Sequence, residues 1–65
     1  MVYRLKGSVS DVSRLMLDFE ISKPLQAFSA PHETLDVLVS VEDDASEDFE
    51  ISALEMDVVA TEEGE

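Results

Sequence analysis

The chain has 65 residues, no cysteine, 45% hydrophobic residues and a formal net charge of −12 at pH 7. A chain this short forms one domain that buries only about 60% of the surface its unfolded form exposes, and without cysteine it has neither disulfides nor thiolate metal sites to add stability. Its hydrophobic content exceeds that of a disordered acidic tail, so we expect a marginally stable domain over residues 1–60 with an acidic frayed tail at residues 61–65.

Neither a membrane span nor a signal peptide is expected. No apolar run approaches the roughly 20 residues that a transmembrane helix needs. Residues 1–6 include Arg4 and Lys6 and lack the apolar core of a signal peptide. The sequence therefore predicts a soluble, cytoplasmic protein.

The acidic residues are concentrated in the second half of the chain. Residues 1–32 have a net charge of +1, whereas residues 33–65 contain thirteen acids and no base, a charge of −13. Such a surface repels nucleic acid and anionic lipid and attracts basic partners. Solubility or adaptation to a salt-rich cytosol would also explain acidity, but adaptation should spread the acids along the whole chain. Their confinement to one half indicates a specific surface.

Two strands are expected in the first half. A β-prone run predicts an edge or hairpin strand at about residues 2–7, which Gly7 and the polar stretch after it end in a turn. Residues 12–21 fit two patterns. A helix capped by Ser10 would have the apolar stripe Val12, Leu15, Met16 and Phe19. A strand, which leaves fewer apolar residues misplaced, would alternate through Leu15, Leu17, Phe19 and Ile21, and we predict the strand.

Two prolines mark the next boundaries. Pro24 ends the second element, and residues 25–29 form a short strand or its continuation. After Pro31, the caps available at Ser29 or Thr34 favour a short helix within residues 34–44. The alternative is an all-β meander, because Val37, Val39 and Val41 are β-branched and alternate, with residues 42–48 as a wide hairpin loop.

The last element spans residues 49–59. Its apolar residues change parity near Ser52, which a β-bulge would correct. The alternative is a capping box, Ser52-Ala53-Leu54-Glu55, that opens a helix. We predict the bulged strand. The fold class expected is α+β, a small three-stranded antiparallel sheet with one short helix packed on it in the order β-β-α-β, and the alternative is the all-β meander.

The predicted core contains one or more large apolar side chains from each expected element. Its members are Tyr3, Leu5, Leu15, Leu17, Phe19, Ile21, Phe28, Leu35, Leu38, Val39, Phe49, Ile51, Leu54, Met56 and Val58.

One acidic pattern matches the spacing of a calcium-binding loop. The ligand positions would be Asp44, Ser46, Asp48, Glu50, Ser52 and Glu55. Phe49 stands where that loop needs glycine for its sharp turn, so we expect weak cation association and no specific metal site. We expect no cofactor.

The residues typical of an active site are not grouped in the sequence. His32 is the only histidine, no serine has a neighbouring base, and no phosphate-binding loop is present. The paired carboxylates lie in a solvated run, whereas general acid catalysis needs a buried carboxyl group with a raised pKa. We therefore expect a protein that is not an enzyme.

A local resemblance concerns residues 33–36 and 49–51. The run Glu33-Thr34-Leu35-Asp36, followed by Phe49-Glu50-Ile51 after an extended segment, resembles the sheet-helix-strand layout of small phage-encoded inhibitors of host RNA polymerase. The resemblance covers about a third of the chain and carries over no functional residue. It implies a viral or mobile-element interaction protein.

These observations predict a small acidic module that occludes a basic, nucleic-acid-binding surface of a partner protein, as an inhibitor or nucleic-acid mimic, without binding nucleic acid itself. On a strand, carboxylates at i and i+2 lie about 6.6 to 6.8 Å apart, near twice the axial charge spacing of one DNA strand. The predicted partner-binding residues are Glu42, Asp43, Asp44, Glu47, Asp48, Glu50, Glu55 and Asp57. The alternative is a structural or assembly subunit, acidic only for solubility, whose edge strand at Val2–Lys6 pairs with a neighbour or a second copy.

Overall fold

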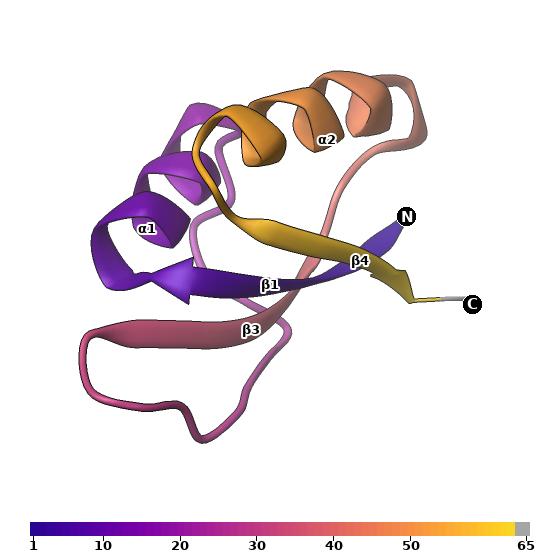
Figure 1. Cartoon of the computed structure of the whole chain (residues 1–65). Helices are drawn as coiled ribbons and strands as arrows, with labels where there is room; N and C mark the ends of the chain where they lie inside the picture. Colours follow the sequence, from indigo (N-terminus) through magenta and orange to yellow (C-terminus); the bar gives the residue numbers. More distant parts are fainter. Residues whose placement is uncertain (64–65) are drawn as a thin grey trace.

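The structure is a computed structural model that describes residues 1–63. A four-stranded antiparallel sheet in the order β2-β3-β1-β4 carries two helices on one face (Figure 1). In chain order the elements are β1 (Val2–Ser8), α1 (Val9–Asp18), β2 (Gln26–Ala27), β3 (Thr34–Ser40), the 3₁₀ turn η1 (Asp43–Ala45), α2 (Ser46–Glu55) and β4 (Val59–Glu63). The order β-α-β-β-α-β is that of the split βαβ, or ferredoxin-like, motif.

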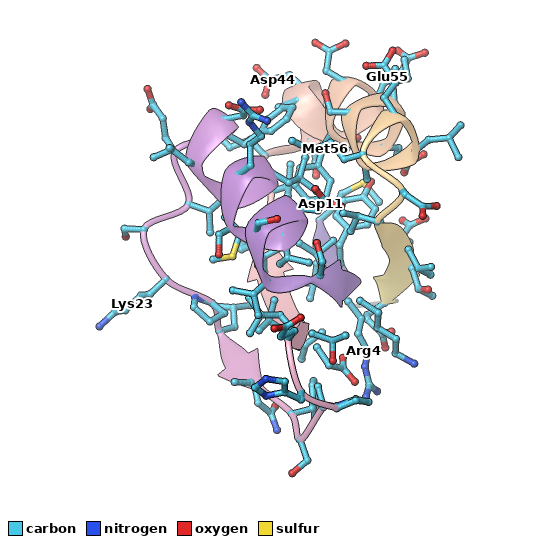
Figure 2. The ribbon with its side chains drawn as sticks, turned by 60° about the vertical axis from the view of Figure 1, so that its left-hand side comes forward. Arg4, Asp11, Lys23, Asp44, Glu55 and Met56 are labelled. Carbon is cyan, nitrogen blue, oxygen red and sulfur yellow. The ribbon has the colours of Figure 1, made fainter. Side chains whose placement is uncertain are left out.

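The two faces of the sheet differ because side chains alternate along each strand. Tyr3 and Leu5 of β1 are fully buried on the face that the helices cover. Arg4 and Lys6 project from the opposite, open face. Figure 2 accordingly shows Arg4 on the side of the molecule remote from Asp44. Two of the four basic residues of the chain therefore lie on the open face of the sheet.

Helix α1 follows β1 directly, and hydrogen bonds at its two ends define where it begins and ends. The Ser8 hydroxyl accepts a hydrogen bond of 3.1 Å from the backbone N–H of Asp11, which caps the first turn. The buried stripe is Val12, Leu15 and Met16. At the other end Glu20 has a left-handed φ of 59°, and Ile21 N–H bonds the carbonyl oxygen of Met16 at 2.8 Å. This is a Schellman ending with glutamate in place of glycine.

The core is centred on the ring of Phe49, which is fully buried. Its centroid lies 5.0 Å from that of Tyr3 on β1 and 5.2 Å from that of Phe19 at the end of α1. Both distances are typical of favourable aromatic pairs. One side chain therefore holds α2 against both the sheet and α1. The buried residues around it are Tyr3, Leu5, Val12, Leu15, Met16, Val37, Val39, Val41, Ala53 and Val58.

The predicted α+β class is confirmed, but the number of elements is not. Residues 12–21, predicted as a strand, belong mainly to α1, with Ser8 and not Ser10 as the cap. The expected helix within residues 34–44 is the strand β3. The expected bulged strand at residues 49–59 is mainly α2, which begins at Ser46 and not at the Ser52 capping box. The meander alternative is also wrong, because η1 and α2 occupy the segment it assigned to a loop.

Several finer expectations are corrected as well. Strand β1 is not an edge strand, because it pairs with β3 on one side and β4 on the other. Strand β4 continues through Glu63, past the expected domain end at residue 60, while residues 64–65 lie outside the described residues. The sheet-helix-strand layout behind the phage-inhibitor resemblance is not present, since residues 34–36 begin a strand and residues 49–51 lie within a helix.

The predicted core is correct for ten of its fifteen residues, which are buried or pack against the buried cluster, and wrong for the other five. Leu17, Ile51 and Leu54 have exposed side chains, because they lie on the outer faces of α1 and α2. Leu38 and Phe28 lie outside the core, beside Arg4 on the open face of the sheet.

The buried residues that the prediction missed are Val12, Met16, Val37, Val41 and Ala53. Most of these errors follow from assigning a helix to a segment that is a strand, or the reverse, which changes the face on which a side chain lies.

Replacing Phe49 by alanine should lower the free energy of unfolding by about 3 to 5 kcal/mol, because it removes the ring at the centre of the core. That loss is a large part of the stability of a domain this small. The matched control is Leu17→Ala, at a position 76% exposed, which should change the value by no more than about 0.5 kcal/mol. Urea unfolding followed by circular dichroism measures both. Equal losses for the two variants would contradict the placement of α1.

Replacing Glu20 by glycine should raise the free energy of unfolding by about 1 kcal/mol, because glycine adopts the left-handed conformation without the steric cost that glutamate incurs. Asp18→Gly is the control, since it removes the same charge from the last helical position of α1, where glycine is unfavourable by about 1 kcal/mol. Thermal or urea unfolding should show opposite signs for the two variants. A destabilised Glu20→Gly variant would argue against the Schellman ending.

Candidate protein-binding surface

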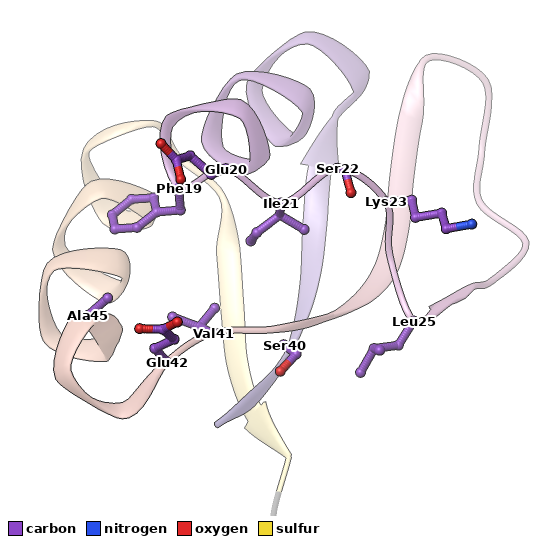
Figure 3. A pocket seen from close by; sticks show the side chains of 10 residues that line it. All are labelled: Phe19, Glu20, Ile21, Ser22, Lys23, Leu25, Ser40, Val41, Glu42 and Ala45. Carbon is purple, nitrogen blue, oxygen red and sulfur yellow. The ribbon is translucent and has the colours of Figure 1, made fainter.

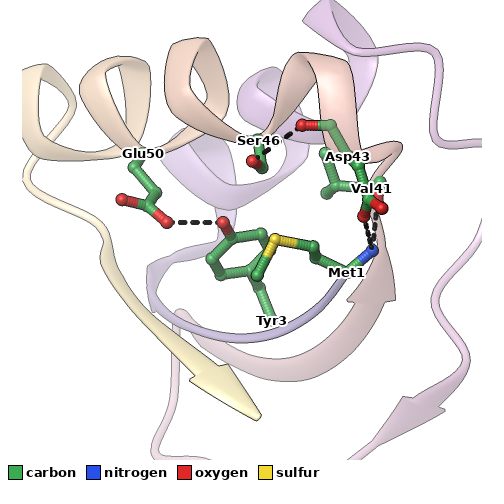
Figure 4. A network of polar contacts seen from close by, with 6 residues as sticks. All are labelled: Met1, Tyr3, Val41, Asp43, Ser46 and Glu50. Atoms are coloured by element: carbon green, nitrogen blue, oxygen red, sulfur yellow. Dashed lines mark hydrogen bonds and ion pairs between the residues drawn. The ribbon is translucent and has the colours of Figure 1, made fainter. Parts of the chain in front are cut away.

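The acidic segment from residue 42 to residue 57 is helical for most of its length. The backbone of Asp43 accepts a hydrogen bond of 2.9 Å from the Ser46 hydroxyl, joining η1 to the first turn of α2 (Figure 4). Glu47 and Asp48 stand in that first turn, where the helix dipole stabilises negative charge. The local excess of acid is therefore compatible with a helix that begins at this point.

The end of α2 repeats the ending of α1. Asp57 has a left-handed φ of 61°. Its N–H bonds the carbonyl oxygen of Leu54 at 3.2 Å, and the N–H of Val58 bonds that of Ala53 at 2.8 Å. This Schellman ending turns the chain sharply into β4. The carboxylate of Asp57 is exposed at the turn.

All eight predicted partner-binding residues are exposed. Glu42, Asp43 and Asp44 lie before or in η1, the next four lie in α2, and Asp57 follows it. Figure 2 shows Asp44 and Glu55 on the same side of the molecule, pointing away from the ribbon. Residues 33–63 contain no lysine or arginine that could neutralise this surface. The structure therefore brings the predicted residues together on one mainly helical segment, residues 42–57, which we call the acidic surface.

Two of these carboxylates have partners inside the protein. Glu50 accepts a hydrogen bond of 2.5 Å from the hydroxyl of Tyr3 (Figure 4). Asp43 lies 3.2 Å from the amino group of Met1, which also donates to the carbonyl oxygen of Val41 at 2.6 Å. These contacts connect the acidic surface to β1 and to the end of β3.

The Tyr3 hydroxyl is the titrating group most affected by this arrangement. Burial of the phenol raises its pKa from 10.0 to about 12, and the hydrogen bond to the Glu50 carboxylate adds to the shift. The negative charge of Glu62 on β4 acts in the same direction. A neutral tyrosine therefore donates to Glu50 across the whole physiological pH range.

The open face of the sheet has a different electrostatic character. Arg4 donates from Nε and Nη2 to the two carboxylate oxygens of Asp36, at 2.8 and 2.9 Å. Its guanidinium also lies 4.0 Å from the centroid of the Phe28 ring. The hydrogen bond lowers the pKa of Asp36 and raises that of Arg4. The bidentate pair neutralises this face locally.

The strand spacing predicted for the carboxylates is wrong, and the calcium-loop pattern does not form a loop. Residues 48, 50 and 55 lie on a helix, where carboxylates at i and i+2 point in different directions. They do not form the strand spacing proposed to imitate phosphates. The calcium-loop positions likewise fall in η1 and α2, which follow each other directly. Within residues 1–63 no group of three or more acidic or histidine side chains is arranged to hold a metal ion.

The outer face of α2 also contains apolar residues that the sequence analysis placed in the core. Ile51 is 51% exposed and Leu54 is 81% exposed. Because Phe49 and Ala53 are the buried residues of this helix, the helical period places Ile51 and Leu54 on the opposite side, beside Glu47 and other acids. Assigning this segment as a helix would have predicted their exposure, because residues two and five positions after the buried Phe49 lie on the opposite face of a helix.

One hollow with both polar and apolar lining lies between the loop that follows α1 and the end of β3 (Figure 3). It has a volume of about 420 Å³. Its charged side chains are Glu20, Lys23 and Glu42, all exposed, and it contains no nucleophile with a neighbouring base. His32 is exposed in the loop before β3. Neither feature groups the residues that an active site would need.

Comparisons with known protein families, curated proteins and solved structures find no match for this chain. Among residues 1–63, no helix has the length and apolar character required to cross a membrane. A shared fold motif alone does not specify a function, so function has to be argued from the surface itself.

Tyr3 is the only tyrosine, so tyrosinate absorbance during an alkaline titration reports on this one group. It should titrate near pH 12 in the folded protein and near 10 when unfolded. Because the folded pKa is the higher one, this contribution to stability is complete below pH 10 and is lost as pH rises through 12.

The matched variants of this titration are Glu50→Gln and Glu47→Gln, which remove the same charge. Glu50→Gln should lower the Tyr3 pKa while leaving it above 10, because burial, the larger cause, remains. Glu47→Gln, in the first turn of α2, should leave it unchanged. A Tyr3 that titrates near 10 in the folded parent would show that the phenol is solvated.

Proposed function

We propose that this protein is a small acidic binding module that occludes a basic, nucleic-acid-binding surface of a partner protein. It acts as an inhibitor or nucleic-acid mimic and has no catalytic activity. The observation that supports this most directly is the acidic surface: eight exposed carboxylates from residue 42 to residue 57, with no lysine or arginine in the same half of the chain. A surface of this kind accelerates encounter with a basic partner and repels nucleic acid.

The apolar residues on the same helix distinguish binding from mere solubility. Acidity for solubility needs no exposed aliphatic side chains, yet Ile51 and Leu54 are exposed among the acids of α2. Interfaces combine an apolar centre with a polar rim, and the apolar centre supplies most of the affinity. The acids then provide orientation and choice of partner, while Ile51 and Leu54 provide contact area.

The mimicry in this proposal is one of charge and not of phosphate spacing, because the helix does not reproduce the spacing of a strand. Helical carboxylates form a broad negative field, which competes with DNA or RNA for a basic surface without matching it atom by atom. The alternative role as an assembly subunit depended on an edge strand at residues 2–6. That strand is central in the sheet, so no specific observation favours this alternative.

The proposal is tested with two triple variants that have equal net charge. Asp44→Asn, Glu47→Gln and Asp48→Asn neutralise part of the acidic surface, whereas Asp18→Asn, Glu20→Gln and Glu33→Gln neutralise acids elsewhere. Binding is measured against a panel of purified basic DNA- and RNA-binding domains at low and high salt, with duplex DNA as competitor. The first triple variant should lose at least about tenfold in affinity for the domains that bind the parent, and the control no more than about twofold.

Affinity should also fall as salt increases, and DNA should displace the protein, because both compete for the same basic surface. Equal losses for the two triple variants would show that only net charge matters. Failure of the parent to bind any basic domain at low salt would overturn the proposal.

A further inference from the structure

Within the described residues 1–63, strand β4 forms one edge of the sheet, with β1 as its only neighbour in the strand order. The hydrogen-bonding pattern of β1 determines which backbone groups of β4 are bonded to β1 and which face the open edge. Met1 and Val41 exchange backbone hydrogen bonds of 2.6 and 2.7 Å. Backbone direction alternates along a strand, so the odd-numbered residues of β1 bond β3 and the even-numbered residues bond β4. The register places Val59, Thr61 and Glu63 opposite those even-numbered residues.

It follows that Ala60 and Glu62 direct their backbone N–H and C=O groups away from β1, toward the open edge. Such groups are the template on which a further strand can pair. The side chains of these two residues share a face with Tyr3 and Leu5, their partners in the register, which is the face that the helices cover. A strand added here would therefore place every second side chain beneath the end of α2.

That position coincides with a shallow, mainly apolar groove. Its volume is about 330 Å³, and its lining comprises Ala53, Leu54, Val58, Val59 and Ala60, with the carboxylates of Glu50 and Asp57. Leu54 is 81% exposed at this groove, whereas the side chain of Val59, the register partner of Lys6, lies on the open face. The groove is thus formed by the helix and by the edge strand itself, and the side chain of Leu54 is available there for contact.

The charges around the edge select what can occupy it. Glu50 and Asp57 line the groove, and Glu62 and Glu63 are exposed on β4. A second copy that paired its β4 here would bring the same carboxylates opposite one another, and like charges across strands are destabilising. A segment with arginine or lysine would instead find carboxylates on both faces of this edge, with Glu62 on the helix face and Glu63 on the open face. The charges at this edge therefore disfavour pairing with a second copy of the chain and favour pairing with a basic strand.

We propose that the open edge of β4 and the groove between α2 and β4 bind an extended basic segment of the partner protein by strand addition. Because side chains alternate between the two faces of a strand, the aliphatic side chains of that segment lie on the helix face, beneath Leu54 and beside Ala60. Its basic side chains lie on the open face, beside Asp57 and Glu63. The backbone groups of Ala60 and Glu62 supply the hydrogen bonds. This assignment rests on the proposed function, and it adds the form of the bound segment and the place where it binds.

The test uses a synthetic peptide of about ten residues in which arginine and valine alternate, with both ends blocked. Two matched peptides have N-methyl groups on either the valines or the arginines, so that charge and side chains are unchanged. Because alternate N–H groups point to opposite sides of a strand, strand addition requires only one of the two sets. One methylated peptide should lose about tenfold or more in affinity, and the other should bind within about twofold of the parent peptide.

Protein variants locate the site independently of the peptide chemistry. Ala60→Pro removes an N–H that faces the open edge and none that bonds β1, and proline is tolerated on such edges. It should weaken binding by about tenfold, and Leu54→Ala should weaken it several-fold. Leu17→Ala on α1, which removes a leucine that is exposed like Leu54, should have no effect on binding. If Ala60→Pro does not fold, Leu54→Ala and the methylated peptides still decide the outcome.

The outcomes separate this inference from the proposed function. If both methylated peptides bind as the parent peptide does, or both lose binding equally, strand addition is wrong, whereas the acidic surface can still bind basic domains in the triple-variant experiment. If sizing shows a dimer that Ala60→Pro dissociates, the edge pairs with a second copy and this assignment is wrong. If neither the peptide nor any basic domain binds, both proposals fail together.

Discussion

The packing of Phe49 between Tyr3 and Phe19 determines where the acidic surface lies. Helix α2 has few other buried residues with which to attach itself, since the only other fully buried member is Ala53. With the ring of Phe49 fixed against the sheet and α1, the rotation of the helix about its axis is set. The acids of α2, together with Ile51 and Leu54, then face outward. The orientation of the proposed binding surface is therefore a consequence of one aromatic cluster in the core.

The sequence predicted the fold class and the exposure of the acids, but it misassigned three elements for identifiable reasons. Neither helix ends in glycine. Glu20 and Asp57 occupy the left-handed positions instead, so the usual stop signal is missing. The start of α1 resembles a turn in the sequence, because the capping Ser8 follows Gly7 and stands in the polar stretch that contains Ser10 and Asp11. Strand β3 shows its β-branched alternation clearly, but the proline and serine before it resembled the start of a helix.

Helix α2 could not be recognised from its apolar pattern, because that pattern serves two surfaces. Phe49 and Ala53 satisfy the core, while Ile51 and Leu54 face outward. A helix with apolar residues on both sides lacks a single apolar stripe. Its sequence therefore resembles a strand in which the apolar residues change parity at a bulge. A segment whose local pattern disagrees with its fold is where a functional surface is expected. Here the misleading residues are the ones assigned to partner contact.

The distribution of charge also explains how such an acidic chain can leave a sheet edge open. An uncovered edge strand normally invites pairing between copies, and β4 is uncovered on the side of Ala60 and Glu62. A net charge of −12 makes every approach of a second copy unfavourable, and the carboxylates at the edge oppose the final pairing step. The same charges favour the approach of a basic chain. The same electrostatic repulsion that opposes pairing of two copies is thus compatible with an open edge, and it is also the basis of the proposed preference for a basic partner.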